Sequence, residues 1–245
     1  MNRNKNILII GGSGGIGSEI LKKFVENNYN CYFTYSKNLI FLEKKFLKKN
    51  NKSIIPLKIN FLDKNWKNKL KVKLKKIKII DCLVNCVGIN IIKKFDKISY
   101  DDFRKINSIN YESFFFATQL SLKKLKQSNN PRIVNISSIW SVVSKSKRTL
   151  YSGTKGAINS FTRSLSLECS KNNILVNCVS PGFVETALTK ASLSKKEINS
   201  LKKTIPLERF ANPKEIAEIV YFFGSEKNSY TTGQNIICDG GFTVQ

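Results

Sequence analysis

The chain of 245 residues contains no histidine, and this absence excludes several kinds of active site. Without imidazole there is no Ser-His-Asp or Cys-His nucleophile system, no zinc site built on histidine and no HExxH protease motif. Histidine is also the side chain best suited to proton transfer near neutral pH. Acid–base chemistry must therefore come from a tyrosine, lysine, cysteine or carboxylate whose pKa the protein has shifted.

Long apolar runs are missing as well. No stretch reaches 18 apolar residues, so we expect no membrane-spanning helix and no membrane partner. Only four apolar residues precede Gly11, too few for the core of a signal peptide, and we expect a cytoplasmic protein. No repeat, linker or low-complexity tract divides the sequence, which predicts a single domain over residues 1–245.

Acidic residues are scarce, since 17 Asp and Glu stand against 42 Lys and Arg, a formal net charge of +25. Such an excess can indicate nucleic-acid binding. Only six of the basic residues are arginine, however, the better side chain for phosphate and base contacts. The lysines are also spread over almost every expected helix. We therefore expect no specific nucleic-acid partner.

The cysteines fall mostly within apolar, strand-like runs. They are Cys31, Cys82, Cys86, Cys169, Cys178 and Cys238. Three residues separate Cys82 from Cys86, whereas common zinc and redox pairs have two. We expect buried free thiols, with neither a metal site nor a disulfide.

Short apolar runs alternate with amphipathic, lysine-rich stretches along the chain. We expect strands at 7–10, 31–35, 54–59, 79–85, 133–137, 174–180 and 234–238. We expect helices at 15–27, 39–49, 63–76, 100–126, 151–170 and 213–223. Alternating strands and helices form right-handed crossovers. The pattern predicts an α/β fold, a doubly wound Rossmann-type parallel sheet with helices on both faces.

The turn between the first strand and the first helix is rich in glycine. It contains Gly11, Ser13, Gly14, Gly15, Ile16 and Gly17. Glycines let the backbone approach a pyrophosphate, and the helix N-terminus offers free N–H donors to the phosphates. A glycine turn can also be purely structural, but this position at the first strand favours a bound dinucleotide.

The end of the second expected strand bears on which dinucleotide binds. No Asp or Glu occurs there to repel a 2′-phosphate, whereas Ser36 and Lys37 could bind one. We therefore expect NADP, with NAD less favoured. The alternative is that Lys37 is one more solvated lysine.

Tyr151 and Lys155 stand four residues apart, on one face of an expected helix. An ammonium one turn away is expected to lower the pKa of the phenol from about 10. Ser138 follows a buried strand, at the sheet edge where open α/β sheets bind ligands. Each residue alone has an ordinary structural explanation, but their combination indicates proton transfer to or from a substrate.

Together these segments resemble the short-chain dehydrogenase/reductase family, nearly end to end. Gly11, Gly15 and Gly17 fit its glycine motif, and Ser138, Tyr151 and Lys155 fit its catalytic serine and YxxxK pair. The family's NNAG segment corresponds to Asn85 and Gly88, its strand-three aspartate to Asn60, its helix asparagine to Asn110, and its PG motif to Pro181, Gly182, Val184 and Thr186. The closing TGQ and DGG signatures correspond to 232–234 and 239–241.

The resemblance implies roles for these residues. Tyr151 protonates the carbonyl oxygen while Ser138 hydrogen-bonds it, and Lys155 stabilises the phenolate and contacts the nicotinamide ribose. Asn110 holds a water that relays protons. Thr186 contacts the carboxamide, and Asn85 has a structural role beside the adenine side of the cofactor. The further residues that the resemblance places at the cofactor are Asn60, Asn85, Gly88, Pro181, Gly182 and Val184.

Within the family the chain is most similar to bacterial-type 3-oxoacyl-[acyl-carrier-protein] reductases, which implies NADPH-dependent reduction of a carrier-bound 3-oxoacyl group in fatty-acid synthesis. It also implies a homotetramer formed through the helices of Asn110 and Tyr151. The arginines that dock the acidic carrier in that group are not evident, and Lys123, Lys124, Lys126 and Lys171 lie in the corresponding regions. The alternatives are a reductase of a sugar or other small ketone and, more remotely, a non-catalytic dinucleotide- or RNA-binding protein.

Two departures from the family pattern and one insertion have structural consequences. Ile10 replaces a threonine whose hydroxyl ties the glycine turn to the neighbouring strand. Gly14 stands where NADP-preferring members often have a basic residue. Residues 183–206 are expected to form a lid over the substrate.

An apolar acyl pocket could be lined by Trp140, Val142, Val143, Ile89 and Ile91, although these could equally be core residues.

Overall fold

The computed structural model describes residues 3–37, 53–187, 189 and 194–245. A seven-stranded sheet occupies its centre, with the strand order β3-β2-β1-β4-β5-β6-β7 and parallel pairing throughout. The strands are β1 (Asn6–Ile10), β2 (Asn30–Tyr35), β3 (Ile54–Lys58), β4 (Cys82–Asn85), β5 (Arg132–Ile136), β6 (Leu175–Pro181) and β7 (Asn235–Cys238). The predicted doubly wound α/β fold is confirmed.

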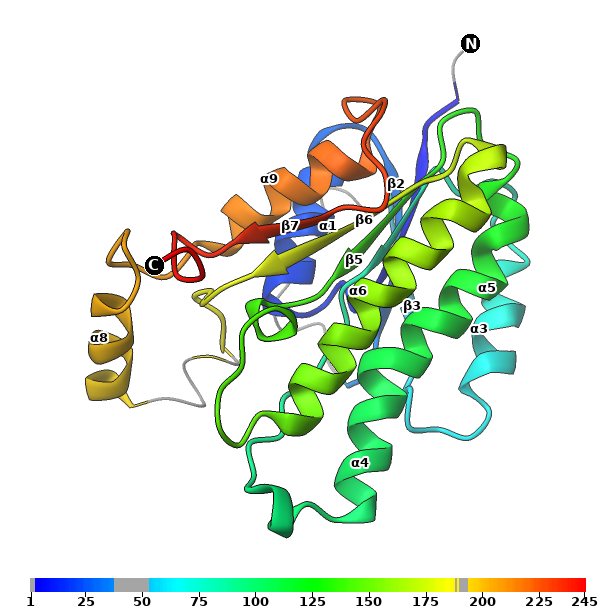
Figure 1. Ribbon diagram of the computed structural model, residues 1–245. Helices are drawn as coiled ribbons and strands as arrows, with labels where there is room; N and C mark the ends of the chain where they lie inside the picture. The colour runs from blue at the N-terminus through cyan, green and yellow to red at the C-terminus, as the bar shows by residue number, and fades with distance from the viewer. Residues whose placement is uncertain (1–2, 38–52, 188, 190–193) are drawn as a thin grey trace.

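Helices cover both faces of this sheet (Figure 1). One face carries α1 (Gly15–Glu26) and α9 (Pro213–Gly224), and the other carries α3 (Trp66–Leu74), α5 (Ser113–Leu125) and α6 (Thr149–Cys169). Two further helices, α4 (Tyr100–Asn107) and α8 (Lys195–Lys203), lie toward the end of the sheet where the strands terminate. Short 3₁₀ turns occupy Phe95–Lys97, Ile139–Ser141 and Ser170–Asn172. The helix expected at 39–49 falls outside the described residues.

The side chains of β1 explain why the sheet is buried on both sides. Ile7 and Ile9 pack under α1 and α9, whereas Leu8 and Ile10 pack under the helices of the opposite face. Successive strand residues point to opposite faces, so a strand in this position must be apolar at every residue. All four side chains are fully buried. The central strands thus hold the carboxyl edge of the sheet in a fixed position.

The long helix predicted at 100–126 is interrupted by a wider π turn, Ser108–Glu112, between α4 and α5. Ser99 starts α4 in a capping box with Asp102. The apolar periodicity predicted the two ends of this region but not the π turn. Asn110 lies within this turn and is fully buried. Such turns are often found at functional sites.

A hydroxyl of β2 ties the glycine turn to the sheet. The backbone N–H of Gly11 donates to Thr34 Oγ1 at 2.8 Å. Ile10 lacks the hydroxyl that the family's threonine uses to tie this turn to the neighbouring strand. In this structure Thr34 of that strand supplies a hydroxyl to the turn.

The thiols are less uniformly buried than expected. Cys31, Cys82, Cys169 and Cys178 are buried free cysteines. In contrast, Cys86 and Cys238 are partly exposed because both lie at or beyond the carboxyl ends of strands. Over the ranges that the structure describes, no three Cys, Asp or Glu side chains are grouped to hold a metal ion. No described helix is both long and apolar enough to cross a bilayer.

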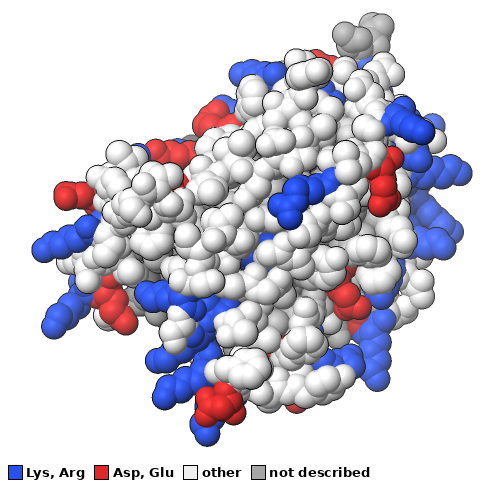
Figure 2. Space-filling model, in the orientation of Figure 1, with Lys and Arg blue, Asp and Glu red and all other residues white. Residues whose placement is uncertain are grey.

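Basic side chains lie mainly around the margin of the face seen in Figure 2, with acidic groups among them and a largely uncharged centre. Several of the basic groups are paired, for example Lys23 with Glu218 and Arg209 with Glu215. On this face the positive charge does not form a single stripe of the kind that tracks a nucleic-acid backbone.

Candidate active site

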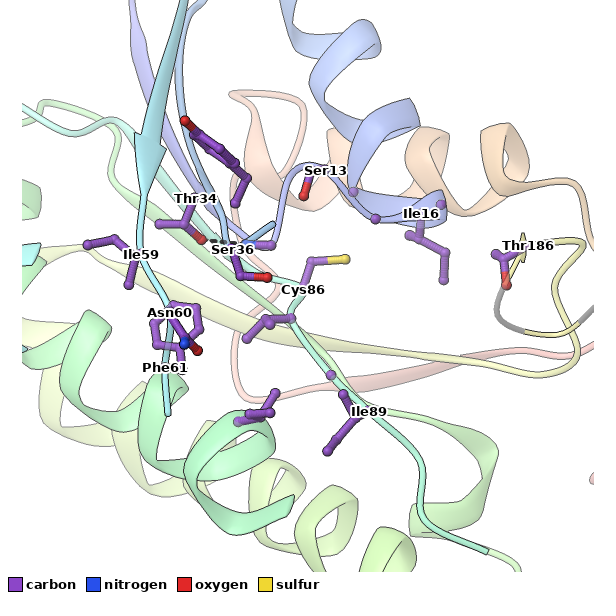
Figure 3. Close-up of a pocket in the computed structure, with 18 of the residues that line it drawn as sticks. Ser13, Ile16, Thr34, Ser36, Ile59, Asn60, Phe61, Cys86, Ile89 and Thr186 are labelled. Carbon is purple, nitrogen blue, oxygen red and sulfur yellow. Dashed lines mark hydrogen bonds between the residues drawn. The ribbon is translucent and has the colours of Figure 1, made fainter. Parts of the chain in front are cut away.

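A cleft of about 540 Å³ opens above the carboxyl ends of β1, β2, β3 and β4. Ten of the residues predicted to bind a dinucleotide line it: Gly11, Ser13, Gly14, Gly15, Ile16, Gly17, Ser36, Asn60, Gly88 and Thr186. In Figure 3, Ser13 and Ile16 form one wall, Asn60 and Phe61 another, and Thr186 lies at the far end. Segments that are distant in sequence therefore converge on one groove.

At the floor of this cleft, the backbone of Gly17 packs directly against the backbone of Gly11. A Cβ atom at Gly17 would lie 2.2 Å from the carbonyl oxygen of Gly11, and Gly11 itself has a φ of +91°. Gly14 caps α1 without any side-chain hydrogen bond, and the first turn of α1 contains no acidic residue. The N–H groups of this turn are therefore available to an anion, and the helix dipole favours one. These features fit the pyrophosphate of a dinucleotide.

The adenosine end of the cleft differs in part from the prediction. Ser36 lines it, whereas Lys37 is exposed and does not. Asn85 also does not line the cleft, because its amide nitrogen donates to Thr118 Oγ1 at 3.1 Å and to Asn135 Oδ1 at 2.8 Å inside the protein. Asn85 therefore joins β4 to β5 and α5, and in this structure it lies inside the protein rather than at the predicted cofactor contact.

Sequence reasoning missed part of the lining. The additional residues are Thr34, Tyr35, Ile59, Phe61, Cys86, Val87, Ile89, Ile109 and Ala187. Most of them lie within a few residues of a strand end. A prediction that included every residue next to the carboxyl end of a strand would have found most of them.

A second pocket, of about 230 Å³, adjoins the cleft and shares Ile16, Cys86, Gly88, Ile89 and Thr186 with it. Its lining brings together the predicted residues Ser138, Tyr151, Lys155, Pro181, Gly182 and Val184. The last three were predicted as cofactor contacts and lie in this pocket rather than in the glycine-turn cleft. The shared residues make one continuous site.

The three central side chains come from two elements. Ser138 is buried just after β5, where its hydroxyl accepts from Trp140 N–H at 3.3 Å. Tyr151 and Lys155 lie one turn apart near the start of α6, with Lys155 Nζ 5.7 Å from the centroid of the phenol ring. The ammonium donates to the carbonyl oxygen of Ile136 at 2.9 Å.

The pKa shifts here correct the expected role of Lys155. Burial raises the pKa of the Tyr151 phenol, and a hydrogen bond with Ser138 and the charge of Arg148 oppose this rise. Burial also lowers the pKa of Lys155 to about 8. Lys155 is thus itself destabilised as a cation, and the pKa of the phenol is raised rather than lowered as expected. Tyr151 is held in its protonated form, as a proton donor requires.

Asn110 does not line either pocket. Its Oδ1 accepts from the N–H of Ile89 at 2.8 Å, and its Nδ2 donates to the carbonyl of Ile89 at 2.9 Å and to Thr154 Oγ1 at 3.2 Å. This two-way bond to one backbone residue holds the segment after β4 against α6. Asn110 is a positioning residue here, and the proton-relaying water stays a prediction.

The outer part of the second pocket is only partly as expected. Trp140 and Ile89 line it, but Val142, Val143 and Ile91 do not. Lys145 and Arg148, which were not predicted, do line it. From the expected lid at 183–206 come Phe183, Val184, Thr186, Thr189 and Leu201, while 188 and 190–193 lie outside the described residues.

A family model described as enoyl-(acyl carrier protein) reductase matches residues 11–243. Among curated proteins, a tropinone reductase homolog of Arabidopsis thaliana is 40% identical over 166 residues, 67% of this chain and 63% of that protein. A 3-oxoacyl-[acyl-carrier-protein] reductase of Aquifex aeolicus is 42% identical over 162 residues, 66% and 65% of the two chains. These two alignments cover slightly less than two thirds of the relatives' lengths. An acetoacetyl-CoA reductase of Acinetobacter is 31% identical over 245 residues, 98% of each chain.

The chain belongs to the short-chain dehydrogenase/reductase family. It is therefore related to NAD(P)-dependent oxidoreductases by sequence and by fold. The solved structure titled ElxO with NADP bound superposes with a TM-score of 0.88 at 27% identity, covering 99% of this chain and 100% of that one. The resemblance that the motifs predicted is confirmed.

Substitution of Gly17 tests the cleft as the dinucleotide site. Gly17→Ala places a methyl group against the Gly11 carbonyl, so the turn must open and cofactor affinity should fall at least about 10-fold. Titration of NADPH fluorescence measures the effect. Gly156→Ala is the matched control, because a Cβ there meets nothing within 4 Å. Equal affinity in the two variants would contradict this assignment of the cleft.

Because the buried charge of Lys155 has no acidic partner among the described residues, we expect this residue to lower the free energy of unfolding. Because burial lowers its pKa from 10.5 to about 8, the ammonium destabilises the folded state at neutral pH. Lys155→Met should raise the free energy of unfolding of the cofactor-free protein at pH 7 by on the order of 1–3 kcal/mol. The gain is largest below pH 8 and shrinks as the pH rises toward 10.5. Urea denaturation at pH 7 and pH 9.5 measures it, and a loss of stability at pH 7 would refute the argument.

Proposed function

We propose that the protein is an NADPH-dependent reductase that converts a carbonyl group to an alcohol, with a 3-oxoacyl thioester on an acyl-carrier protein as its substrate. The observation that supports this most directly is the continuity of the two pockets. Ser138 and Tyr151 line a small pocket that shares a wall with the cleft at the glycine turn. A carbonyl bound there lies between a proton donor and the site that fits the dinucleotide.

The residues of the second pocket act on the carbonyl oxygen. When bound, the reduced nicotinamide supplies the hydride that the carbonyl carbon accepts. Tyr151, kept protonated by its raised pKa, gives its proton to the oxygen. Ser138 donates its one hydroxyl proton in a hydrogen bond to the same oxygen, which helps to hold and polarise the carbonyl. Lys155 binds the ribose beside the nicotinamide, and Asn110 keeps the adjoining backbone in place.

The preference for NADPH rests on the charge of the cleft. No described residue lining it is acidic, so nothing there repels a 2′-phosphate. Ser36 lines the cleft and can donate to that phosphate, with Lys37 next to it in sequence. The solved structure titled ElxO with NADP bound, which has the same fold, supports the same preference.

The carrier and the oligomer belong to the same proposal. Lys123, Lys126 and Lys171 are exposed and suit an acidic carrier, whereas Lys124 already donates to the carbonyl of Ile77. Apolar side chains are exposed on the helices expected to form a homotetramer, among them Phe103, Phe115 and Leu167. Such a surface suits burial against a second copy of the chain.

A second candidate is reduction of a small ketone or sugar, which the modest volume of the pocket and the similarity to tropinone reductase homologs favour. A non-catalytic dinucleotide- or RNA-binding role is a third, and its only support is the charge of +25. NADPH and NADH oxidation are followed separately with acetoacetyl thioesters and a panel of plain ketones. Salt-sensitive RNA retention without NADPH oxidation on any ketone would favour the third candidate.

Tyr151→Phe tests the proton donor. Removal of the hydroxyl should lower kcat by about 10²–10⁴-fold with the preferred ketone, because a positioned general acid contributes that much. NADPH binding, followed by fluorescence, should persist because the ring is retained. Tyr230→Phe is the matched control, since Tyr230 is 94% exposed. A Tyr151→Phe enzyme that turned over at the normal rate would remove the basis of this mechanism.

A further inference from the structure

Arg148 lies at the entrance of the second pocket, directly before α6 and three residues before Tyr151. Its guanidinium lies 5.9 Å from the centroid of the Trp140 ring, which belongs to the same pocket. At this distance the guanidinium and the aromatic ring attract each other through a cation–π contact. The donors at the edge of the guanidinium remain free for other groups.

One of these donors is buried without a partner. Nη1 of Arg148 is shielded from solvent and makes no hydrogen bond within the described part of the chain. No described residue that lines the pocket is an Asp or a Glu. The Oδ1 of Asn90, another lining atom, is itself unpartnered and so does not accept from Arg148. A buried charged donor left unpaired is costly, and at a ligand pocket it indicates that the ligand supplies the acceptor.

We propose that Arg148 donates a hydrogen bond to the C1 carbonyl oxygen of a 3-oxoacyl thioester, the oxygen two carbons away from the ketone that is reduced. This inference rests on the proposed carbonyl reduction and names the residue that selects its substrate class. Arg148 makes the enzyme prefer a 1,3-dicarbonyl compound to an isolated ketone.

The geometry of α6 relates the two oxygens. Three residues separate Arg148 from Tyr151, a rise of about 4.5 Å along a helix axis. With the ketone oxygen at Tyr151 and Ser138, the C1 carbonyl oxygen is directed toward the residues that precede α6, where Arg148 lies. The substrate must then lie with its ketone inward and its thioester toward Arg148 and Lys145.

A thioester carbonyl can supply the acceptor that Nη1 of Arg148 lacks. The surrounding walls include Trp140, Phe183 and Leu201, which are apolar. The charge of Arg148 also acts on Tyr151, where it favours the phenolate that forms as the proton leaves. The negative charge that balances Arg148 therefore forms on Tyr151 during the reaction. The substrate needs to supply only a hydrogen-bond acceptor for Nη1.

Two substrates that differ in one group test the proposal. One is the acetoacetyl thioester of N-acetylcysteamine, and the other is the thioether in which a methylene replaces its C1 carbonyl. Arg148→Met is expected to lower the ratio of kcat/KM for thioester over thioether by about 10–100-fold, the range for a hydrogen bond to a charged group. The ratio is the readout because loss of Arg148 also alters Tyr151 and slows both reactions.

Further variants guard against trivial explanations. Arg163→Met removes an exposed arginine of α6 that bonds only to Ser160 among the described residues, and its ratio should match the wild type. Arg148→Lys keeps the charge without the planar fork and should give an intermediate ratio. An unchanged ratio in Arg148→Met, with a folded protein by circular dichroism, overturns the proposal.

Free acetoacetate is the third substrate of the series. If loss of Arg148 affects only acetoacetate, the arginine binds a carboxylate and the assignment to the thioester carbonyl is wrong. Failure of the proposed function has a different signature, because the wild type would then reduce neither the thioester nor the thioether. The experiment therefore distinguishes failure of the Arg148 proposal from failure of the proposed carbonyl reduction.

Discussion

The site depends on a close approach of backbone to backbone at the first turn. Gly17 packs so tightly on the Gly11 carbonyl that no side chain fits between them, and Thr34 fixes the N–H of Gly11 from the next strand. These contacts aim the N-terminus of α1 into the cleft and leave its donors without a capping side chain. The position of the second pocket follows, because it shares residues with this cleft.

Burial also sets the electrostatics of the site. Lys155 is 3% exposed, and the bond to the Ile136 carbonyl provides no negative charge to balance the ammonium. The same burial raises the pKa of Tyr151, so in both groups it favours the neutral form over the charged one. Groups displaced in this way by a pocket are typical of functional sites and cost stability in the absence of ligand.

The sequence was sufficient for the architecture because each strand and helix has its own apolar period and most are joined by short connections. It placed Ser138, Tyr151 and Lys155 in one pocket from spacing and strand ends alone. It failed where the outcome depends on packing between distant segments. Asn85 was predicted at the cofactor, whereas its Nδ2 donates to Thr118 and Asn135 in the interior. Neither the π turn around Asn110 nor the burial of Arg148 has a local signal.

Arg148 and Lys155 flank Tyr151 along the chain, and both line its pocket. Lys155 stands one turn after Tyr151 in the expected register, but its ammonium is directed to the Ile136 carbonyl. Arg148 precedes the helix, and the Trp140 ring holds its guanidinium beside the pocket. The phenol therefore has cations on both sides along the chain, of which the arginine cannot lose its proton. A lysine with a pKa of about 8 can lose its proton at a mildly alkaline pH, so the two cations of the pocket differ in how firmly their charge is fixed.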